Sequence, residues 1–163
     1  MTVVRRATPE DAEELIRLRQ VMIDSVFAAR SGGESDTSWH AESVPTVRAR
    51  LADPDGEFAA FVVDWPGRPG KLAALVVGTL DYRIGRAGNP HGVNGYVFSV
   101  ATDPEQRRRG YARACMETLL DWFRERGAVS VDLNASAEAE PLYASLGFVR
   151  KPDPSMRLSL QGA

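Results

Sequence analysis

The most strongly patterned part of the sequence is a stretch of helical periodicity from Tyr111 to about Arg126. Its apolar residues recur every three or four positions, which places them on one stripe of a helix. The stripe comprises Ala112, Cys115, Met116, Leu119 and Phe123, with Leu120 and Trp122 at its edges. Gly127 follows as a C-terminal cap. A stripe of this width predicts a core helix that packs on a β-sheet.

Strand patterns stand on both sides of this helix. Short apolar or alternating runs predict strands at 2–7, 57–65, 71–84, 95–101, 129–136 and 156–160, and helical spacing predicts helices at 8–27, 44–53 and 137–148. The turn sequence at 66–70 predicts a hairpin between the second and third strands. Hairpins followed by strand–helix–strand crossovers predict an α+β fold, with a mixed sheet and helices on its faces.

The composition limits the class of protein. A chain of 163 residues suits one domain, 1–163, and a net charge of −2 argues against a nucleic-acid-binding surface over the whole protein. Cys115 is the single cysteine, and His40 and His91 are the only histidines, so we expect no disulfide and no metal site. Neither a long apolar run nor a leader is visible, and we expect a cytoplasmic protein.

Three arginines, Arg107 to Arg109, stand where the core helix begins. The helix dipole disfavours cations there by about 0.3–1 kcal/mol each. Gly110 has no side chain to shield the free backbone N–H groups, and Ala112 has a small one, so an anion can approach closely. Arg113 adds charge at the same point. The pattern predicts a phosphate or pyrophosphate site, the alternative being a solvated basic turn.

Neither the P-loop pattern nor G-x-G-x-x-G occurs in the chain. Instead the run Arg107-Arg108-Arg109-Gly110-Tyr111-Ala112 resembles the R/Q-x-x-G-x-G/A signature of the GCN5-related N-acetyltransferase (GNAT) family. The resemblance extends from about Tyr96 to Arg150, and includes the family's Leu-Tyr and Gly-Phe markers at Leu142, Tyr143, Gly147 and Phe148. Before Tyr96 the agreement is limited to the element order and the segment 4–15.

The resemblance implies the GNAT fold, a mixed and mostly antiparallel sheet of six to seven strands with about four helices. It implies acetyl-CoA as cosubstrate, with the pyrophosphate at 107–112. Backbone groups of Val100 and Thr102 would pair with the pantetheine arm where this strand bulges and splays from the next one. A backbone N–H near Val100 would stabilise the carbonyl oxygen. Asn134 resembles a residue that binds the cofactor arm, although it could equally cap the following helix.

Tyr143 matches the family's general acid, which would protonate the departing thiolate. Its ring could instead only pack in the core. The acceptor amine must be neutral to attack, because a free alkyl amine has a pKa of roughly 10. The base that removes its proton stays unassigned among Asp81, Tyr82, Tyr96, Ser99, Glu138 and Glu140.

Cys115 is the rival nucleophile, but its place on the apolar stripe favours a buried structural thiol. We therefore expect direct transfer in a ternary complex to a primary amine of a small molecule or a protein. The segments 29–43 and 85–94 are expected to shape the acceptor pocket, Trp39 and His40 among them. A non-catalytic acyl-CoA-binding module and a nucleic-acid-binding protein remain alternatives, and similar proteins are often homodimers.

Overall fold

The computed structural model describes residues 2–28 and 35–161. Their strands form one sheet in the order β1-β2-β3-β4-β5, antiparallel except for the parallel pair β4 and β5. The strands are β1 (Arg5–Arg6), β2 (Phe58–Asp64), β3 (Leu72–Tyr82), β4 (Val93–Thr102) and β5 (Val131–Leu133). The expected mixed sheet with a hairpin between β2 and β3 is confirmed.

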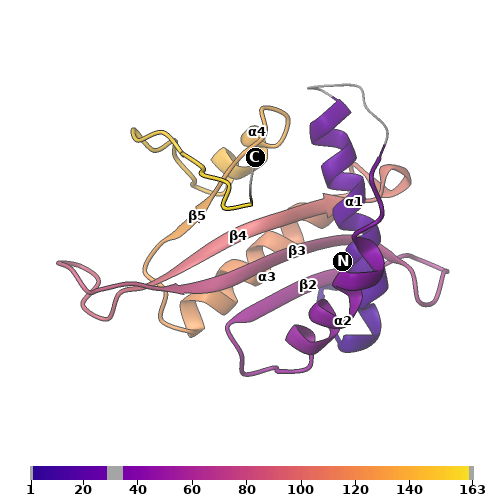
Figure 1. Cartoon of the computed structure of the whole chain (residues 1–163), viewed down its shortest axis with the longest axis horizontal. Helices are drawn as coiled ribbons and strands as arrows, with labels where there is room; N and C mark the ends of the chain where they lie inside the picture. Colours follow the sequence, from indigo (N-terminus) through magenta and orange to yellow (C-terminus); the bar gives the residue numbers. More distant parts are fainter. Residues whose placement is uncertain (1, 29–34, 162–163) are drawn as a thin grey trace.

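Helices cover both faces of the sheet (Figure 1). On one face lie α1 (Ala12–Ala28) and α2 (His40–Leu51), and on the other lies α3 (Tyr111–Glu125). The short α4 (Glu140–Ser145) follows β5. Alternate β2 and β3 side chains enter two separate cores, since successive strand residues point to opposite faces. Ala60, Val62 and Leu75 pack toward α1, whereas Phe61 and Val76 pack with the stripe of α3.

The predicted stripe of α3 is confirmed. Cys115, Met116, Leu119 and Phe123 are all buried, and Gly127 ends the segment with a φ of 84°, which glycine adopts without steric cost. Gly95 on β4 lets the ring of Phe123 lie directly against the strand, because a Cβ at this position would come within 2.7 Å of the ring. This close packing fixes α3, and therefore its N-terminal turn, relative to β4.

An irregularity interrupts the pairing of β3 with β4. Val77 pairs with Ser99, but the next β3 residue, Gly78, pairs with Val97, which leaves Phe98 as an extra residue in β4. A bulge of this kind shifts the alternation of side chains between the faces. The rings of Phe98 and Phe58 have their centroids 6.2 Å apart, and Ser99 Oγ accepts a hydrogen bond from Arg19 on α1. Phe98 and Ser99 therefore both lie on the α1–α2 face.

Three sequence predictions need correction. The described sheet has five strands rather than six or seven, because residues 156–160 form no strand, and Met156, Leu158 and Leu160 are each more than 80% exposed. The segment before them contains Pro152 and Pro154, which have no N–H to donate to a ladder. The helix expected at 44–53 begins earlier, at His40, with Pro45 inside it.

The first helix begins as predicted near Thr8, with a 3₁₀ turn at Pro9–Asp11 ahead of α1. The Thr8 N–H donates to Asp11 Oδ2 at 2.8 Å, and Arg5 donates to both oxygens of the same carboxylate. This arrangement ties the start of α1 to β1. Of the helices in the described ranges, none combines the length and apolar character needed to cross a membrane.

Candidate active site

One edge of β4 is open beyond the bulge. In the described chain β5 pairs with β4 only from Gly95 to Val97, so the stretch from Phe98 to Thr102 has no strand beside it on that edge. On the other edge, the N–H of Asp103 donates to the carbonyl of Ala73 in β3 at 2.8 Å. Backbone groups of successive residues alternate between the two edges. The N–H and C=O groups of Val100 and Thr102 therefore point into the gap between β4 and β5.

The turn after β4 has an unusual backbone. A 3₁₀ turn at Pro104–Gln106 is capped by Asp103 Oδ1, which accepts from the N–H of Glu105 at 3.0 Å. The chain then passes through Arg108 with φ 62° and Gly110 with φ 78°, both in the left-handed region. Left-handed residues among helical or extended ones turn successive N–H groups to one side, which makes an anion-binding concavity.

The N-terminus of α3 has no side-chain cap. The N–H groups of its first turn thus retain the capacity to bind a ligand. Tyr111 and Ala112 are the first two residues of the helix, and Gly110 presents no Cβ in front of them. The main-chain arrangement at 107–112 is the one that an anion cradle requires.

The side chains around this turn carry uncompensated positive charge. Arg107, Arg108 and Arg109 are exposed, and in the ranges 2–28 and 35–161 none of them forms an ion pair. Arg113 is engaged instead, donating to Glu117 at 3.2 Å and to Ser145 Oγ on α4. The first three guanidiniums are available to an anion, whereas Arg113 also links α3 to α4.

Tyr143 lies on α4 and is buried in the core that α3 forms with the sheet. Its ring meets Phe148 edge-on, with centroids 6.0 Å apart. No side chain of the described residues accepts from or donates to its hydroxyl within hydrogen-bond distance. Burial raises the pKa of Tyr143, so the phenol holds its proton at neutral pH.

Asn134 follows β5, and its Nδ2 donates to the hydroxyl of Tyr96 on β4 at 3.0 Å. The side chain therefore bridges the two strands that border the gap. It makes no hydrogen bond to α4 among the described residues. The N-terminus of α4 has no side-chain cap, and Ser136 Oγ accepts from the N–H of Ala139 in the turn before it. The capping alternative for Asn134 is thus wrong for this structure.

Cys115 is completely buried on α3, and desolvation raises the pKa of its thiol to about 12. A thiol with such a pKa is almost entirely protonated at neutral pH and is a poor nucleophile. The described residues contain no cluster of three or more His, Cys, Asp or Glu side chains that could hold a metal ion.

A cavity of about 400 Å³ lies on the opposite face, between α1, α2 and the sheet. We call it the α1–α2 cavity. It reaches the bulge of β4 at Phe98 and Ser99, and Arg19 and Trp39 line it from the helical side. Sequence reasoning missed Arg19, because its contact with Ser99, 80 positions away, is visible only in the folded chain. No residue of 85–94 lines this cavity, and residues 29–34 lie outside the described ranges.

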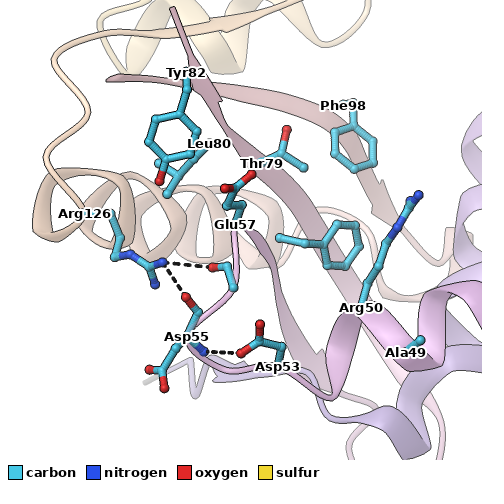
Figure 2. A pocket seen from close by; sticks show the side chains of 12 residues that line it. Ala49, Arg50, Asp53, Asp55, Glu57, Thr79, Leu80, Tyr82, Phe98 and Arg126 are labelled. Atoms are coloured by element: carbon cyan, nitrogen blue, oxygen red, sulfur yellow. Dashed lines mark hydrogen bonds between the residues drawn. The ribbon is translucent and has the colours of Figure 1, made fainter. Parts of the chain in front are cut away.

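A wider groove of about 970 Å³ adjoins the cavity and shares Arg50, Phe58 and Phe98 with it (Figure 2). Its floor carries Thr79 and Leu80 of β3, and Asp53, Asp55 and Glu57 stand along the loop before β2. Arg126 holds this loop by donating to the carbonyls of Asp55 at 2.7 Å and Gly56 at 3.0 Å. The groove and the α1–α2 cavity border one another at these shared residues.

Comparisons with known proteins agree with this architecture. A model of the acetyltransferase (GNAT) family matches residues 22–148. The [ribosomal protein bS18]-alanine N-acetyltransferase of Escherichia coli K12 is 40% identical over 55 residues, and the match covers 32% of this chain and 37% of that protein. The chain thus matches well under half the length of this curated relative.

Solved structures match over nearly the whole chain. A predicted acetyltransferase with acetyl-CoA from Clostridium acetobutylicum superposes with a TM-score of 0.78 at 21% identity, covering 98% of this chain and 97% of that one. A GCN5-related N-acetyltransferase from Ralstonia eutropha superposes with a TM-score of 0.72 at 24% identity, covering 97% and 99%. At these identities the structures establish the shared fold.

Proposed function

The chain belongs to the acetyltransferase (GNAT) family, and from this premise we propose that it transfers the acetyl group of acetyl-CoA to a primary amine. The observation that carries the proposal is the combination at one end of the β4–β5 gap. There a helix N-terminus without a side-chain cap, two left-handed residues and three guanidiniums with no ion pair among the described residues lie beside the open edge of a bulged strand.

The residues fit coenzyme A in two places. The turn from Arg107 to Ala112 would hold the pyrophosphate through main-chain N–H groups, with guanidiniums supplying charge. The open edge at Val100 and Thr102 would hold the pantetheine amides by imitating strand addition. When bound, acetyl-CoA supplies an acyl group activated as a thioester.

Two groups of the chain then act on the transfer. The N–H of Val100 faces the gap just after the bulge, where it would stabilise negative charge on the carbonyl oxygen. Tyr143 would donate its proton to the departing thiolate, because its buried phenol stays protonated at neutral pH. Asn134 would hold the cofactor arm beside Tyr96, which it contacts across the gap.

The acceptor would enter from the opposite side of the sheet, through the α1–α2 cavity. This cavity ends at Phe98 and Ser99, the bulged residues that immediately precede Val100. The amine and the thioester would therefore meet at the bulge, from opposite faces. Because the Cys115 thiol is buried and protonated, the amine attacks directly and no acetyl-cysteine forms.

The test is release of free thiol from acetyl-CoA in the presence of a panel of amines, together with calorimetry of CoA binding. We expect CoA to bind and at least one class of amine to accelerate thiol release. Binding without transfer to any amine would favour a non-catalytic acyl-CoA-binding module. No binding of CoA would remove the proposal, and an oligonucleotide gel shift would then test the nucleic-acid alternative.

A further inference from the structure

Arg19 differs from the other arginines of its neighbourhood in having no counter-ion. Within the described ranges, no carboxylate lies within ion-pair distance of its guanidinium, and Nη1 donates to Ser99 Oγ. Arg17, two positions earlier on α1, holds Glu14 and Asp103, and Arg5 on β1 holds Asp11 and Asp64. Arg19 is therefore a partly buried cation whose only hydrogen-bond partner in the described chain is a neutral hydroxyl.

A partly buried charge without a partner is unfavourable, because it has lost water without gaining an opposite charge. Burial accordingly lowers the pKa of Arg19. An anion entering the α1–α2 cavity would supply what is missing. The planar fork of a guanidinium matches a carboxylate with two parallel hydrogen bonds, which makes a carboxylate the best-fitting anion.

The position of Arg19 limits how far this carboxylate lies from the reacting amine. Ser99, which contacts the guanidinium, immediately precedes Val100, whose N–H faces the β4–β5 gap. A ligand held by Arg19 therefore reaches the bulge within a few bonds. This spacing suits an amine and a carboxylate on the same or neighbouring carbon atoms.

The rest of the cavity is mainly apolar. Leu15 of α1 and Val77 of β3 line it, and the rings of Phe58 and Phe98 line the part that it shares with the groove. Arg50 also lines it, but this side chain is exposed and its guanidinium lies over the ring of Phe58, 5.9 Å from the centroid. Glu42 stands on the exposed rim. A volume of about 400 Å³ suits a small molecule with an apolar body.

We propose that the acceptor is an apolar amino acid, with its carboxylate held by Arg19 and its side chain packed between Leu15, Val77 and Phe98. This inference rests on the proposed acetyl transfer and names its substrate class. A nearby cation also disfavours the charged form of the acceptor amine. Arg19 would thus both place the amine and help it to reach the neutral state that attacks.

The first test uses the unaltered protein and matched acceptors. L-phenylalanine, L-phenylalaninamide and 2-phenylethylamine, and the same three forms of L-leucine, are compared by thiol release from acetyl-CoA. We expect kcat/KM for the free acid to exceed that for the amide and the amine by about 10- to 100-fold, as for a hydrogen-bonded charge pair. The amide has the more easily deprotonated amine, so amine ionisation alone would place the amide above the acid, which makes these two the decisive comparison.

The second test assigns the preference to a residue. Arg19→Gln is expected to lower kcat/KM for the free acid to about the level of the amide and the amine, and calorimetric binding of CoA, which does not involve Arg19, reports that the variant is folded. Arg19→Lys is expected to keep a weakened preference, since the charge remains without the fork. Arg48→Gln, an exposed change on α2 outside the cavity, serves as the control. Arg50→Gln tests the other arginine that lines the cavity.

The outcomes separate this inference from the proposed function. Transfer to amines with no preference for the acid, or a preference that survives in Arg19→Gln, would overturn the amino acid assignment and leave the acetyltransferase standing. A preference abolished by Arg50→Gln and not by Arg19→Gln would also overturn it. No thiol release with any amine would remove the proposed function, and this inference with it.

Discussion

Asp103 Oδ2 accepts a hydrogen bond of 2.7 Å from Arg17 Nη1, which joins α1 to the first residue after β4. Asp103 is only 6% exposed, and its second oxygen caps the 3₁₀ turn that leads to the arginine cluster. Arg17 in turn donates to Glu14 and to the carbonyl of Leu72. The proposed pyrophosphate turn is thus anchored to the helix on the opposite face of the sheet.

Asp103→Asn should destabilise the protein by about 1–3 kcal/mol, because a buried hydrogen bond loses its charge. Burial opposes ionisation of Asp103, but hydrogen bonds from Arg17 and the Glu105 N–H outweigh it and lower the pKa. A lowered carboxyl pKa stabilises the fold above the unfolded value of about 3.9 and loses this effect as the pH falls. The difference in free energy of unfolding between wild type and Asp103→Asn, measured with denaturant, should therefore become smaller as the pH is lowered into the acid range.

The matched control is Asp121→Asn. Asp121 also accepts from an arginine, Arg124, at 2.7 Å, but both side chains are about 70% exposed. An exposed pair of this kind contributes little, so we expect a change within about 0.5 kcal/mol. Equal effects at positions 103 and 121 would show that the Arg17 contact does not anchor the turn.

Gly110→Ala should weaken CoA binding by about tenfold or more, because the left-handed φ of 78° is strained for alanine and the cradle must shift. Gly127→Ala provides a close control at the other end of α3. It has a φ of 84°, and at both positions an added Cβ would have no atom within 4 Å. Both variants should lose about 1–2 kcal/mol of stability, but only Gly110→Ala should change the calorimetric Kd for CoA. Weakened binding in both would mean that the effect is general destabilisation.

Tyr143→Phe should lower kcat by about 100-fold while leaving the Kd for CoA unchanged, as expected for loss of a general acid. The hydroxyl has no hydrogen-bond partner among the described side chains, so stability should be almost unaffected.

Burial raises the pKa of Tyr143, and an acid with a raised pKa loses its proton only at higher pH. As the pH is raised, loss of the Tyr143 proton should therefore not lower the wild-type kcat before about pH 10, the ordinary pKa of a phenol. A Tyr143→Phe variant with full kcat would exclude the acid role.

The parts of the fold that the sequence predicted are those fixed by local interactions. The stripe of α3, its glycine cap at Gly127 and the hairpin at 66–70 each depend on residues within a few positions of one another. The proposed anion site at the Arg–Gly turn also rests on local sequence, because the misplaced charges of Arg107 to Arg109 are visible without knowledge of the sheet. Local patterns also misled, since Pro45 is typical of a first helical turn but lies well inside α2.

The other side of the site depends on contacts between distant segments. Arg19 and Ser99 are 80 positions apart, and neither residue type indicates a cavity in its own sequence context. The C-terminal alternation of Met156, Leu158 and Leu160 satisfies a strand pattern, yet a strand also needs a neighbour with free backbone groups. Periodicity indicates which face of a segment is apolar, but it does not indicate whether a neighbouring strand is available to pair with it.

Cys115 provides the last prediction, which separates direct transfer from a covalent route. Its thiol is fully buried with a pKa raised to about 12, so iodoacetamide at pH 8 should leave the native protein unmodified and react only in denaturant. Cys115→Ala should keep kcat and lose about 1 kcal/mol of stability, because removing the sulfur leaves a small cavity beside the sheet. After incubation with labelled acetyl-CoA, peptide mass spectrometry should detect no label on this residue. Acetyl-Cys115 that disappears on adding an acceptor amine would instead establish a two-step transfer, and the place of this thiol between α3 and the sheet would then require the helix to open during turnover.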